Sequence, residues 1–456
     1  MNDLSTLITG SDYFLVAVYA ILGYMLMRYF IFRNMNQSFY GIIKLFFTLK
    51  VFCFLLMCLL TIYYWKEGDA IFYYGEGQNL FQLFKEDLSN IKYLFLPVES
   101  YQTRIGLDSD LIKTYNGSGT ESSFLVSKLC AILYPFSLGR YLLVNFFFCL
   151  ISSVAQIKLF IVLSKRYPHL SGSISLCVLF MPTLLLYATP IFKETLCFAF
   201  IGFGAYNIYR ILKKENVVLN VFSLVINLTL IFLVKPYVLY AMLLSVALVS
   251  FIGFIIKKMR GSVLSKMITS VFVLMLLAAF ISNLSLFDPY ILIFTDTSNF
   301  LQEQYSNSLG ESSSFGIGEM ETTFKGLLQK LPIGAYTTYF RPHLWEVRKP
   351  IILFSALECF FILCLSIWAF LKNGKYLLRF LREDKFARYL FVYTIILSAI
   401  IGLTTFNFGT LIRYKVPGVP FFWFFIFMLF YYTPPPPQDK KKVLPKEVVP
   451  EENSIL

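Results

Sequence analysis

The chain has 456 residues, of which 57% are hydrophobic, 18% aromatic and 15% charged, and its mean hydropathy is +0.67. A soluble domain carries about 25% charged residues. The composition therefore excludes a soluble globular protein and predicts an all-α polytopic membrane protein. The formal net charge is +13, but the basic residues lie in short scattered loops and form no continuous basic face. This distribution argues against a nucleic-acid partner.

Apolar runs long enough to cross a bilayer recur along the chain. The first run lacks a basic n-region and a small-residue cleavage site, so it is not expected to be a signal peptide. We predict about eleven spans, near residues 12–32, 45–64, 141–163, 172–189, 194–210, 217–234, 237–256, 267–286, 351–371, 389–405 and 419–432.

The basic residues predict the orientation of these spans. About half of the 40 lysines and arginines fall in segments on one predicted face, namely 33–44, 165–170, 210–215, 257–266, 372–388 and 440–446. The positive-inside rule makes that face cytoplasmic. We therefore expect a multi-pass protein of the plasma (inner) membrane with its N-terminus outside and its C-terminus in the cytoplasm. Part of the positive charge then contacts anionic membrane lipid.

Two loops, about 65–140 and 287–350, are too long to be simple connectors. Both fall on the predicted outer face and hold more than half of the 27 acidic residues. Their amphipathic segments 80–96, 124–134 and 324–339 predict short helices along the membrane surface. Segment 306–314, rich in Ser, Gly and Asn, predicts a mobile tip. We thus expect one transmembrane domain over 1–433 and a disordered cytoplasmic tail over 434–456.

Cysteine and histidine exclude several kinds of site. All eight cysteines except Cys130 fall inside predicted spans, so no outer disulfide framework is expected. The two histidines, His169 and His343, fall on opposite predicted faces, which argues against a zinc site or a Ser-His-Asp triad. A glycine-rich phosphate loop is also missing from the sequence, so ATP-driven activity is not expected.

The most informative segment is Lys66-Glu67-Gly68-Asp69-Ala70-Ile71-Phe72-Tyr73-Tyr74. It follows the second predicted span directly and opens the first outer loop. Ionisable side chains at the end of an apolar span are costly, and they are usually kept for binding or chemistry. Glu67 and Asp69 are therefore candidate catalytic carboxylates, and Tyr73 and Tyr74 are candidate substrate contacts.

Polar clusters at four other points of the chain fall on the same predicted face. Arginine binds phosphate through a bidentate fork, and lysine binds it as a point charge. These clusters predict a site for an anionic substrate. The candidate binding residues in them are Lys193, Glu194, Lys235, Arg341, Trp345, Glu346, Arg413 and Tyr414.

Each cluster also has a purely structural interpretation. Lys193 with Glu194, and Arg341 with Glu346, are each compatible with a simple ion pair. Lys235 is compatible with snorkelling from a helix end. Glu67 and Asp69 are compatible with capping the helix of the first loop. Inside a span, Glu358 is expected either to pair with Lys158 or Arg413 or to stay protonated.

The acidic site at the end of a span, followed by a long outer loop with surface helices, resembles the GT-C superfamily of integral membrane glycosyltransferases. The likeness is to bacterial members related to protein mannosyltransferases and lipid A aminoarabinose transferases. It is carried by Gly68-Asp69 with Tyr73 and by Arg413-Tyr414 with Pro417 and Pro420. In this chain the acidic loop follows the second span, so the first span would be an added helix.

The resemblance implies transfer of a sugar from a polyprenyl-phosphate donor to a glycan, lipid or protein acceptor in cell-envelope polysaccharide biosynthesis. Asp69 would be the general base. Lys193, Lys235, Arg341 and Arg413 would stabilise the departing phosphate. Tyr74 and Trp345 would stack on the sugar. No cofactor is expected, although some members hold a divalent metal at the acidic site, for which Glu67 and Asp69 are the candidates.

Three other functions stay open on the sequence alone. A repeat-unit polymerase or ligase of the O-antigen type would make Arg341 and Arg413 central and Asp69 incidental. A lipid or polysaccharide transporter lacks support, because the sequence has no internal repeat. A structural role in an envelope complex has no positive signature.

Overall fold

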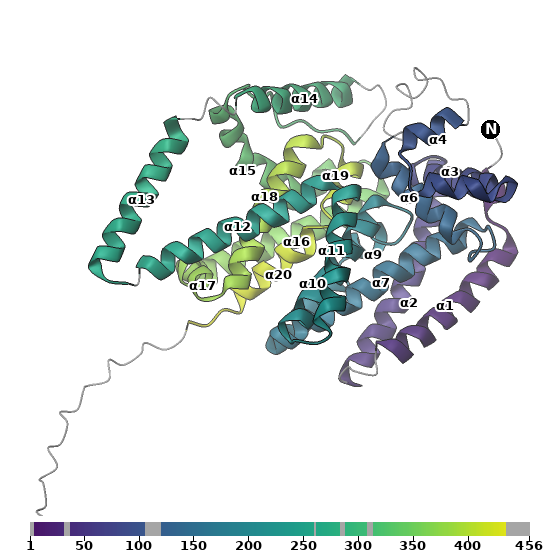
Figure 1. The fold of residues 1–456 in the computed structure, drawn as a ribbon, viewed down its shortest axis with the longest axis horizontal. Helices are drawn as coiled ribbons and strands as arrows, with labels where there is room; N and C mark the ends of the chain where they lie inside the picture. Colours follow the sequence, from purple (N-terminus) through teal and green to yellow (C-terminus); the bar gives the residue numbers. More distant parts are fainter. Residues whose placement is uncertain are drawn as a thin grey trace, which may run out of the picture.

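The structure, a computed structural model, describes residues 4–31, 37–104, 120–259, 261–282, 288–307 and 313–434. Over these residues the regular structure is helical, apart from one isolated antiparallel bridge between Ser314 and Asn407 (Figure 1). All but the first residue of the predicted disordered tail, 434–456, lies outside the described residues.

Eight helices of the described chain are long and apolar enough to cross a membrane, which confirms the all-α polytopic class. Where two helical pieces run together they form one candidate span, as in α2 with its π-helical end and α16 with α17. The eight are α1 (Gly10–Phe30), α2 (Tyr40–Leu59, continued by Leu60–Trp65), α7 (Tyr141–Arg166), α10 (Lys193–Leu212), α11 (Val217–Val234), α12 (Pro236–Met259), α16 (Pro350–Asn373) with α17 (Leu377–Glu383), and α18 (Lys385–Thr404).

The other three predicted spans are shorter or broken, so the count of eleven stays a prediction. Residues 172–189 form two helices, α8 (Ser171–Val178) and α9 (Pro182–Tyr187), because Pro182 cannot donate a backbone hydrogen bond and starts a new helix. Residues 267–286 fall largely in α13 (Val263–Ser282). The last region consists of α19 (Phe408–Tyr414) and α20 (Val419–Phe430), which are bent by 67° and together make a ninth candidate span.

The first long loop is built from α3 (Asp69–Glu86), α4 (Val98–Arg104) and α6 (Glu121–Leu133). Helices α3 and α6 pack so closely that a Cβ on Gly77 would lie 2.5 Å from Cys130 Cβ. A small core of Leu80, Tyr101 and Phe124 joins them. The segments predicted as surface helices are therefore helical here, while their depth in the membrane stays a prediction.

The second long loop contains α14 (Asp288–Asn307) and α15 (Phe324–Phe340). α15 lies against α18 at a contact between Gly334 and Gly402, where a Cβ on Gly402 would lie 2.0 Å from the Gly334 carbonyl oxygen. Most of the predicted mobile tip, 308–312, lies outside the described residues. Its end is held in place, because Phe408 N donates to Ser313 O at 3.0 Å and Phe315 N donates to Phe406 O at 2.9 Å.

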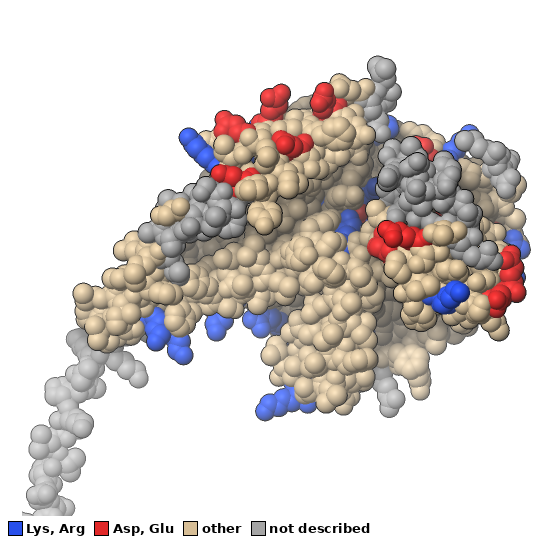
Figure 2. All heavy atoms as spheres, turned by 45° about the horizontal axis from the view of Figure 1, so that its top comes forward, with Lys and Arg blue, Asp and Glu red and all other residues tan. Residues whose placement is uncertain are grey.

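Charged side chains are unevenly distributed over the helix bundle, with most of the visible acidic ones at one end. Figure 2 shows acidic side chains over the α14 region and around α3, with basic side chains along the opposite edge. At that opposite edge Tyr167, which follows α7, donates a hydrogen bond to Asp384 in the connection between α17 and α18 at 2.8 Å. The separation agrees with the predicted grouping of basic loops on one face. Which face is cytoplasmic stays a prediction.

Glu358, in α16, has neither of the partners proposed for it from sequence. Its carboxylate accepts hydrogen bonds from Thr183 N at 2.8 Å and Thr183 Oγ1 at 2.9 Å. The prediction of a pair with Lys158 or Arg413 is wrong, because the break before Pro182 presents the first turn of α9 to the carboxylate. The nearby cation is Lys415.

Candidate functional site

Asp69 is the first residue of α3, directly after the second span ends. The chain reverses there through Lys66, in the left-handed conformation at φ +56°, and Gly68 at φ +124°. A glycine tolerates the latter conformation, which side chains disfavour. The turn places the Asp69 carboxylate at a helix N-terminus, where the helix dipole favours negative charge. Its side chain is 48% exposed and accessible to a substrate.

Asp69 and Arg413 form an ion pair although 344 residues separate them in sequence. Arg413 NH1 donates to Asp69 Oδ2 at 2.7 Å, and the guanidinium carbon lies 5.2 Å from the centre of the Phe192 ring. Asp69 Oδ1 has no hydrogen bond from any described residue. Two residues proposed separately for base and phosphate chemistry are thus in direct contact.

A second, buried ion pair lies at the starts of α10 and α12. Lys235 Nζ is 2.8 Å from Glu194 Oε1, and the two side chains are only 5% and 4% exposed. The same ammonium donates to Tyr237 OH at 3.1 Å and lies 3.7 Å from the centre of the Tyr414 ring. Tyr414 follows Arg413 in α19, so the buried pair supports the helix that carries Arg413.

Lys193 and Tyr73 complete this cluster. Lys193 Nζ donates to Ser122 Oγ of α6 at 2.8 Å. Tyr73 is buried, and burial followed by the charge of Asp69 raises the pKa of its hydroxyl. The cluster consists of three cations and two carboxylates, Asp69, Glu194, Lys193, Lys235 and Arg413, and therefore carries a surplus positive charge. Figure 2 shows basic side chains at the bottom of a hollow between the α14 and α3 regions.

Arg341 and Glu346 form a separate ion pair, as the structural interpretation predicted. The Arg341 guanidinium also lies 4.5 Å from the Phe315 ring centre and 5.4 Å from that of Phe408. Partial burial would raise the pKa of Glu346, but hydrogen bonds from Arg341 and from the His343 amide hold it below its ordinary value. The pair closes the turn that follows α15, and the Arg341 guanidinium connects this turn to Phe408, the first residue of α19.

The remaining predicted site residues lie in other surroundings. Glu67 is exposed, and no described residue donates a hydrogen bond to it. Tyr74 points away from Asp69: its hydroxyl donates to Gly139 O at 2.7 Å, and its ring packs on Tyr141. This buried position leaves no face of Tyr74 for a sugar. Trp345 is 80% exposed, and among the described residues its ring packs against that of His343 with the ring centres 4.6 Å apart.

Sequence reasoning missed three contacts of the site, made by Phe192, Ser122 and Tyr237. Phe192 directly precedes Lys193, and Tyr237 lies two residues after Lys235. Their closeness in sequence to these two predicted lysines could therefore have identified them as site residues. Ser122 had no such signal, because its link to Lys193 spans 71 residues. No group of three or more potential metal ligands occurs among the described residues. A metal at Glu67 and Asp69 stays a prediction.

No protein-family model, curated protein or solved structure matches this chain. Fold and site together define a class: a multi-pass helical membrane protein with a partly exposed carboxylate–arginine pair above a buried carboxylate–lysine pair.

The buried pair should contribute strongly to folding. Glu194→Gln or Lys235→Met alone is expected to destabilise the protein by about 3–5 kcal/mol, because each leaves an uncompensated buried charge. The double variant should recover most of the loss. The melting temperatures of the wild-type protein and of the single and double variants, purified in detergent, test this prediction. Removing the exposed Arg379–Glu383 pair, 45% and 40% exposed, is the control and should change stability by less than about 1 kcal/mol. A double variant no more stable than the single ones would contradict the prediction.

Proposed function

We propose that this chain is a GT-C-type glycosyltransferase that moves a sugar from a polyprenyl-phosphate-linked donor to an acceptor on the outer face of the membrane. The observation that carries the proposal is the contact between Asp69 and Arg413. The reaction needs a general base for the acceptor hydroxyl and a cation for the departing phosphate, and Asp69 and Arg413 bring one of each to the same accessible place, with Arg413 NH1 2.7 Å from Asp69 Oδ2.

The proposed reaction is a displacement at the anomeric carbon of the donor sugar. Asp69 takes the proton of the acceptor hydroxyl through its open Oδ1. The acceptor oxygen forms a bond to the anomeric carbon, and the bond from that carbon to the phosphate oxygen breaks. The electron pair leaves with the polyprenyl phosphate, whose added negative charge is stabilised by nearby cations.

Burial divides the cations into two roles. Arg413, 22% exposed, and Lys193, which is partly exposed, are the groups that reach a phosphate. Lys235 is buried beneath Tyr414 and paired with Glu194, so it positions the α19 helix rather than contacting substrate. Tyr73 is only 4% exposed, so it packs beside Asp69 and supports that carboxylate rather than contacting the substrate.

Binding of the lipid product tests the donor class without knowledge of the sugar. Purified protein in nanodiscs is expected to bind polyprenyl phosphate, and to bind the corresponding polyprenol much more weakly because the phosphate contacts are missing. Sugar transfer is then measured with a panel of polyprenyl-phosphate sugars and native membranes as acceptor. Equal binding of the alcohol and the phosphate, with no transfer from any donor, would refute the proposal.

The proposal places the site outside the cell. Glu67→Cys, two residues before Asp69, is expected to react with a membrane-impermeant maleimide in intact cells, because the basic loops predict that the other face is cytoplasmic. The matched control is His169→Cys, an exposed position at the opposite end of the bundle, which should react only after permeabilisation. Labelling with the reverse pattern would exclude an outer site.

A repeat-unit polymerase or ligase is the second candidate. It is favoured by one observation, that Arg341 packs on Phe408, the first residue of the helix that carries Arg413. This brings both arginines to one corner of the fold. Such an enzyme would depend on the two arginines and tolerate loss of the Asp69 carboxylate.

A further inference from the structure

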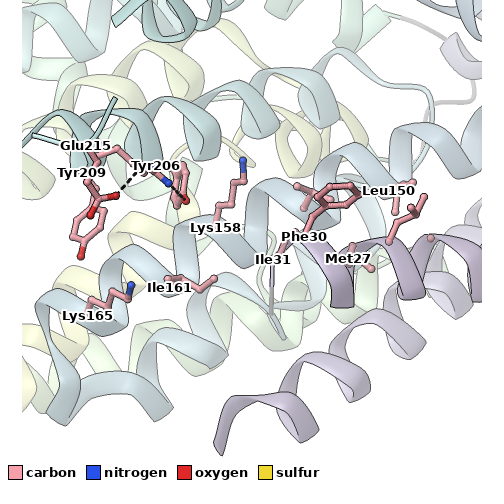
Figure 3. Close-up of a pocket in the computed structure, with 14 residues that line it drawn as sticks. Met27, Phe30, Ile31, Leu150, Lys158, Ile161, Lys165, Tyr206, Tyr209 and Glu215 are labelled. Carbon is pink, nitrogen blue, oxygen red and sulfur yellow. Dashed lines mark hydrogen bonds and ion pairs between the residues drawn. The ribbon is translucent and has the colours of Figure 1, made fainter. Parts of the chain in front are cut away.

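A groove lies at the other end of the bundle from Asp69, between α1, α7 and α10 (Figure 3). It has a volume of about 460 Å³, within the range of small-molecule sites. α10 carries Lys193 of the candidate site at its first turn and Arg210 of the groove at its last. At 1.5 Å per residue the two ends of this helix are about 25 Å apart. The groove is therefore a separate site.

The walls of the groove change from apolar to charged along the helices. At its apolar end α1 approaches α7, because a Cβ on Gly23 would lie 3.2 Å from Leu150 Cδ1. Met27, Phe30 and Val154 continue this apolar surface. One face of α7 then presents Lys158, followed two turns later by Lys165.

Positive charge is in excess at the polar end. Arg210 pairs with Glu215 at 3.0 Å, which leaves Lys158 and Lys165 without a carboxylate within ion-pair distance among the described residues. The Lys158 ammonium lies 4.6 Å from the Tyr206 ring centre and 5.2 Å from that of Phe203. Lys165 lies 5.7 Å from the Tyr209 ring. Figure 3 shows the Lys158 side chain extending from α7 toward α10.

A lysine well inside a span is costly unless an anion or water compensates its charge. Ring faces supply part of this compensation, but they carry no net negative charge. The groove therefore joins an apolar surface to a cationic end, where neither Lys158 nor Lys165 has a carboxylate partner among the described residues. An anionic lipid combines the two matching features, an acyl chain and a phosphate.

We propose that this groove binds an anionic membrane phospholipid. Its phosphate contacts Lys158 and Lys165 with Arg210 at the rim, and one acyl chain lies along Met27 and Val154 toward Gly23. The inference does not depend on the proposed transferase function, because it uses none of the residues around Asp69.

The test is native mass spectrometry of the full-length protein with phosphatidylglycerol, phosphatidylcholine or inorganic phosphate. Phosphatidylglycerol is expected to bind tightly and to raise the melting temperature, whereas phosphatidylcholine and inorganic phosphate have little effect. Lys158→Met should weaken phosphatidylglycerol binding by about tenfold or more, since a charge-assisted contact is lost. Lys165 is exposed, so Lys165→Gln is expected to leave folding intact and to weaken phosphatidylglycerol binding less.

The matched control is Lys372→Met. Lys372 also has its ammonium over an aromatic ring, 4.2 Å from the Phe430 centre, in the last turn of α16 but outside the groove. Lys372→Met should leave phosphatidylglycerol binding unchanged.

A second test variant, Leu26→Trp, narrows the apolar end of the groove without altering its charge, at a side chain that is 56% exposed. Like Lys158→Met, it should weaken phosphatidylglycerol binding. Equal binding of phosphatidylcholine, or unchanged phosphatidylglycerol binding in both Lys165→Gln and Leu26→Trp, would overturn the proposal. Selective binding of polyprenyl phosphate in place of phosphatidylglycerol would overturn the phospholipid assignment.

Discussion

Asp69→Asn is expected to lower sugar transfer by about a hundredfold or more, the usual contribution of a general base. Asparagine keeps the size of the side chain and still accepts the hydrogen bond from Arg413, but it cannot take a proton. Folding should be unaffected, because the Asp69 side chain is 48% exposed and exposed ion pairs contribute little to stability. The measurement is the rate of transfer by purified protein in proteoliposomes, with expression and melting temperature recorded alongside.

Glu67→Gln is the matched control for this change. Glu67 is two residues away and exposed, yet it has no contact with Arg413. Its loss should change transfer only slightly if Asp69 is the acting carboxylate. Full activity in Asp69→Asn would exclude the general-base role and favour the polymerase or ligase. Full activity in Asp69→Asn with none in Glu67→Gln would move the base to Glu67.

Arg413→Ala is expected to weaken binding of the polyprenyl-phosphate donor by about ten- to a hundredfold, the cost of losing a charge-assisted hydrogen bond. Acceptor affinity should change much less. Arg413→Lys should restore donor binding only in part, because lysine keeps the charge but lacks the planar fork that matches phosphate. The probe is polyprenyl phosphate in nanodiscs, which is the lipid product and carries the phosphate and lipid parts of the donor.

Arg379→Ala serves as the matched control for Arg413→Ala. Arg379 also pairs with a carboxylate, Glu383, but at the other end of the bundle. It should leave donor binding unchanged. If Arg413→Ala lowers the melting temperature while polyprenyl-phosphate binding is retained, Arg413 is a structural residue and the donor-site assignment fails.

At the candidate site the sequence predicted which charged residues matter but not which of them form ion pairs. Charged residues at the ends of apolar runs identified Asp69, Glu194, Lys235 and Arg413 as candidates, because such charges are conspicuous against an apolar background. Their pairing was not accessible from the pattern. Asp69 pairs with Arg413 and Lys235 with Glu194 because the starts of α3, α10 and α12 meet the last turn of α19 at one end of the bundle.

Tyr74 and Glu358 make contacts that the sequence did not predict. Tyr73 and Tyr74 are adjacent in sequence, but on a helix neighbouring side chains point about 100° apart. Only Tyr73 faces Asp69, while Tyr74 turns toward Gly139. Glu358 was expected either to pair with Lys158 or Arg413 or to stay protonated. It pairs with neither cation, and the amide and hydroxyl of Thr183 donate to its oxygens. No composition or periodicity argument reveals a backbone donor from a distant helix.

By itself the sequence determined the membrane class, the helical architecture, most of the long spans and the segregation of basic loops. These follow from local physical requirements, since a bilayer demands long apolar helices that satisfy their own backbone hydrogen bonds. The tertiary structure alone decided which charges meet, which aromatic rings are buried, and that a cationic groove forms between α1, α7 and α10. Those features depend on how helices distant in sequence pack, and contacts of that kind leave no period or spacing in a single sequence.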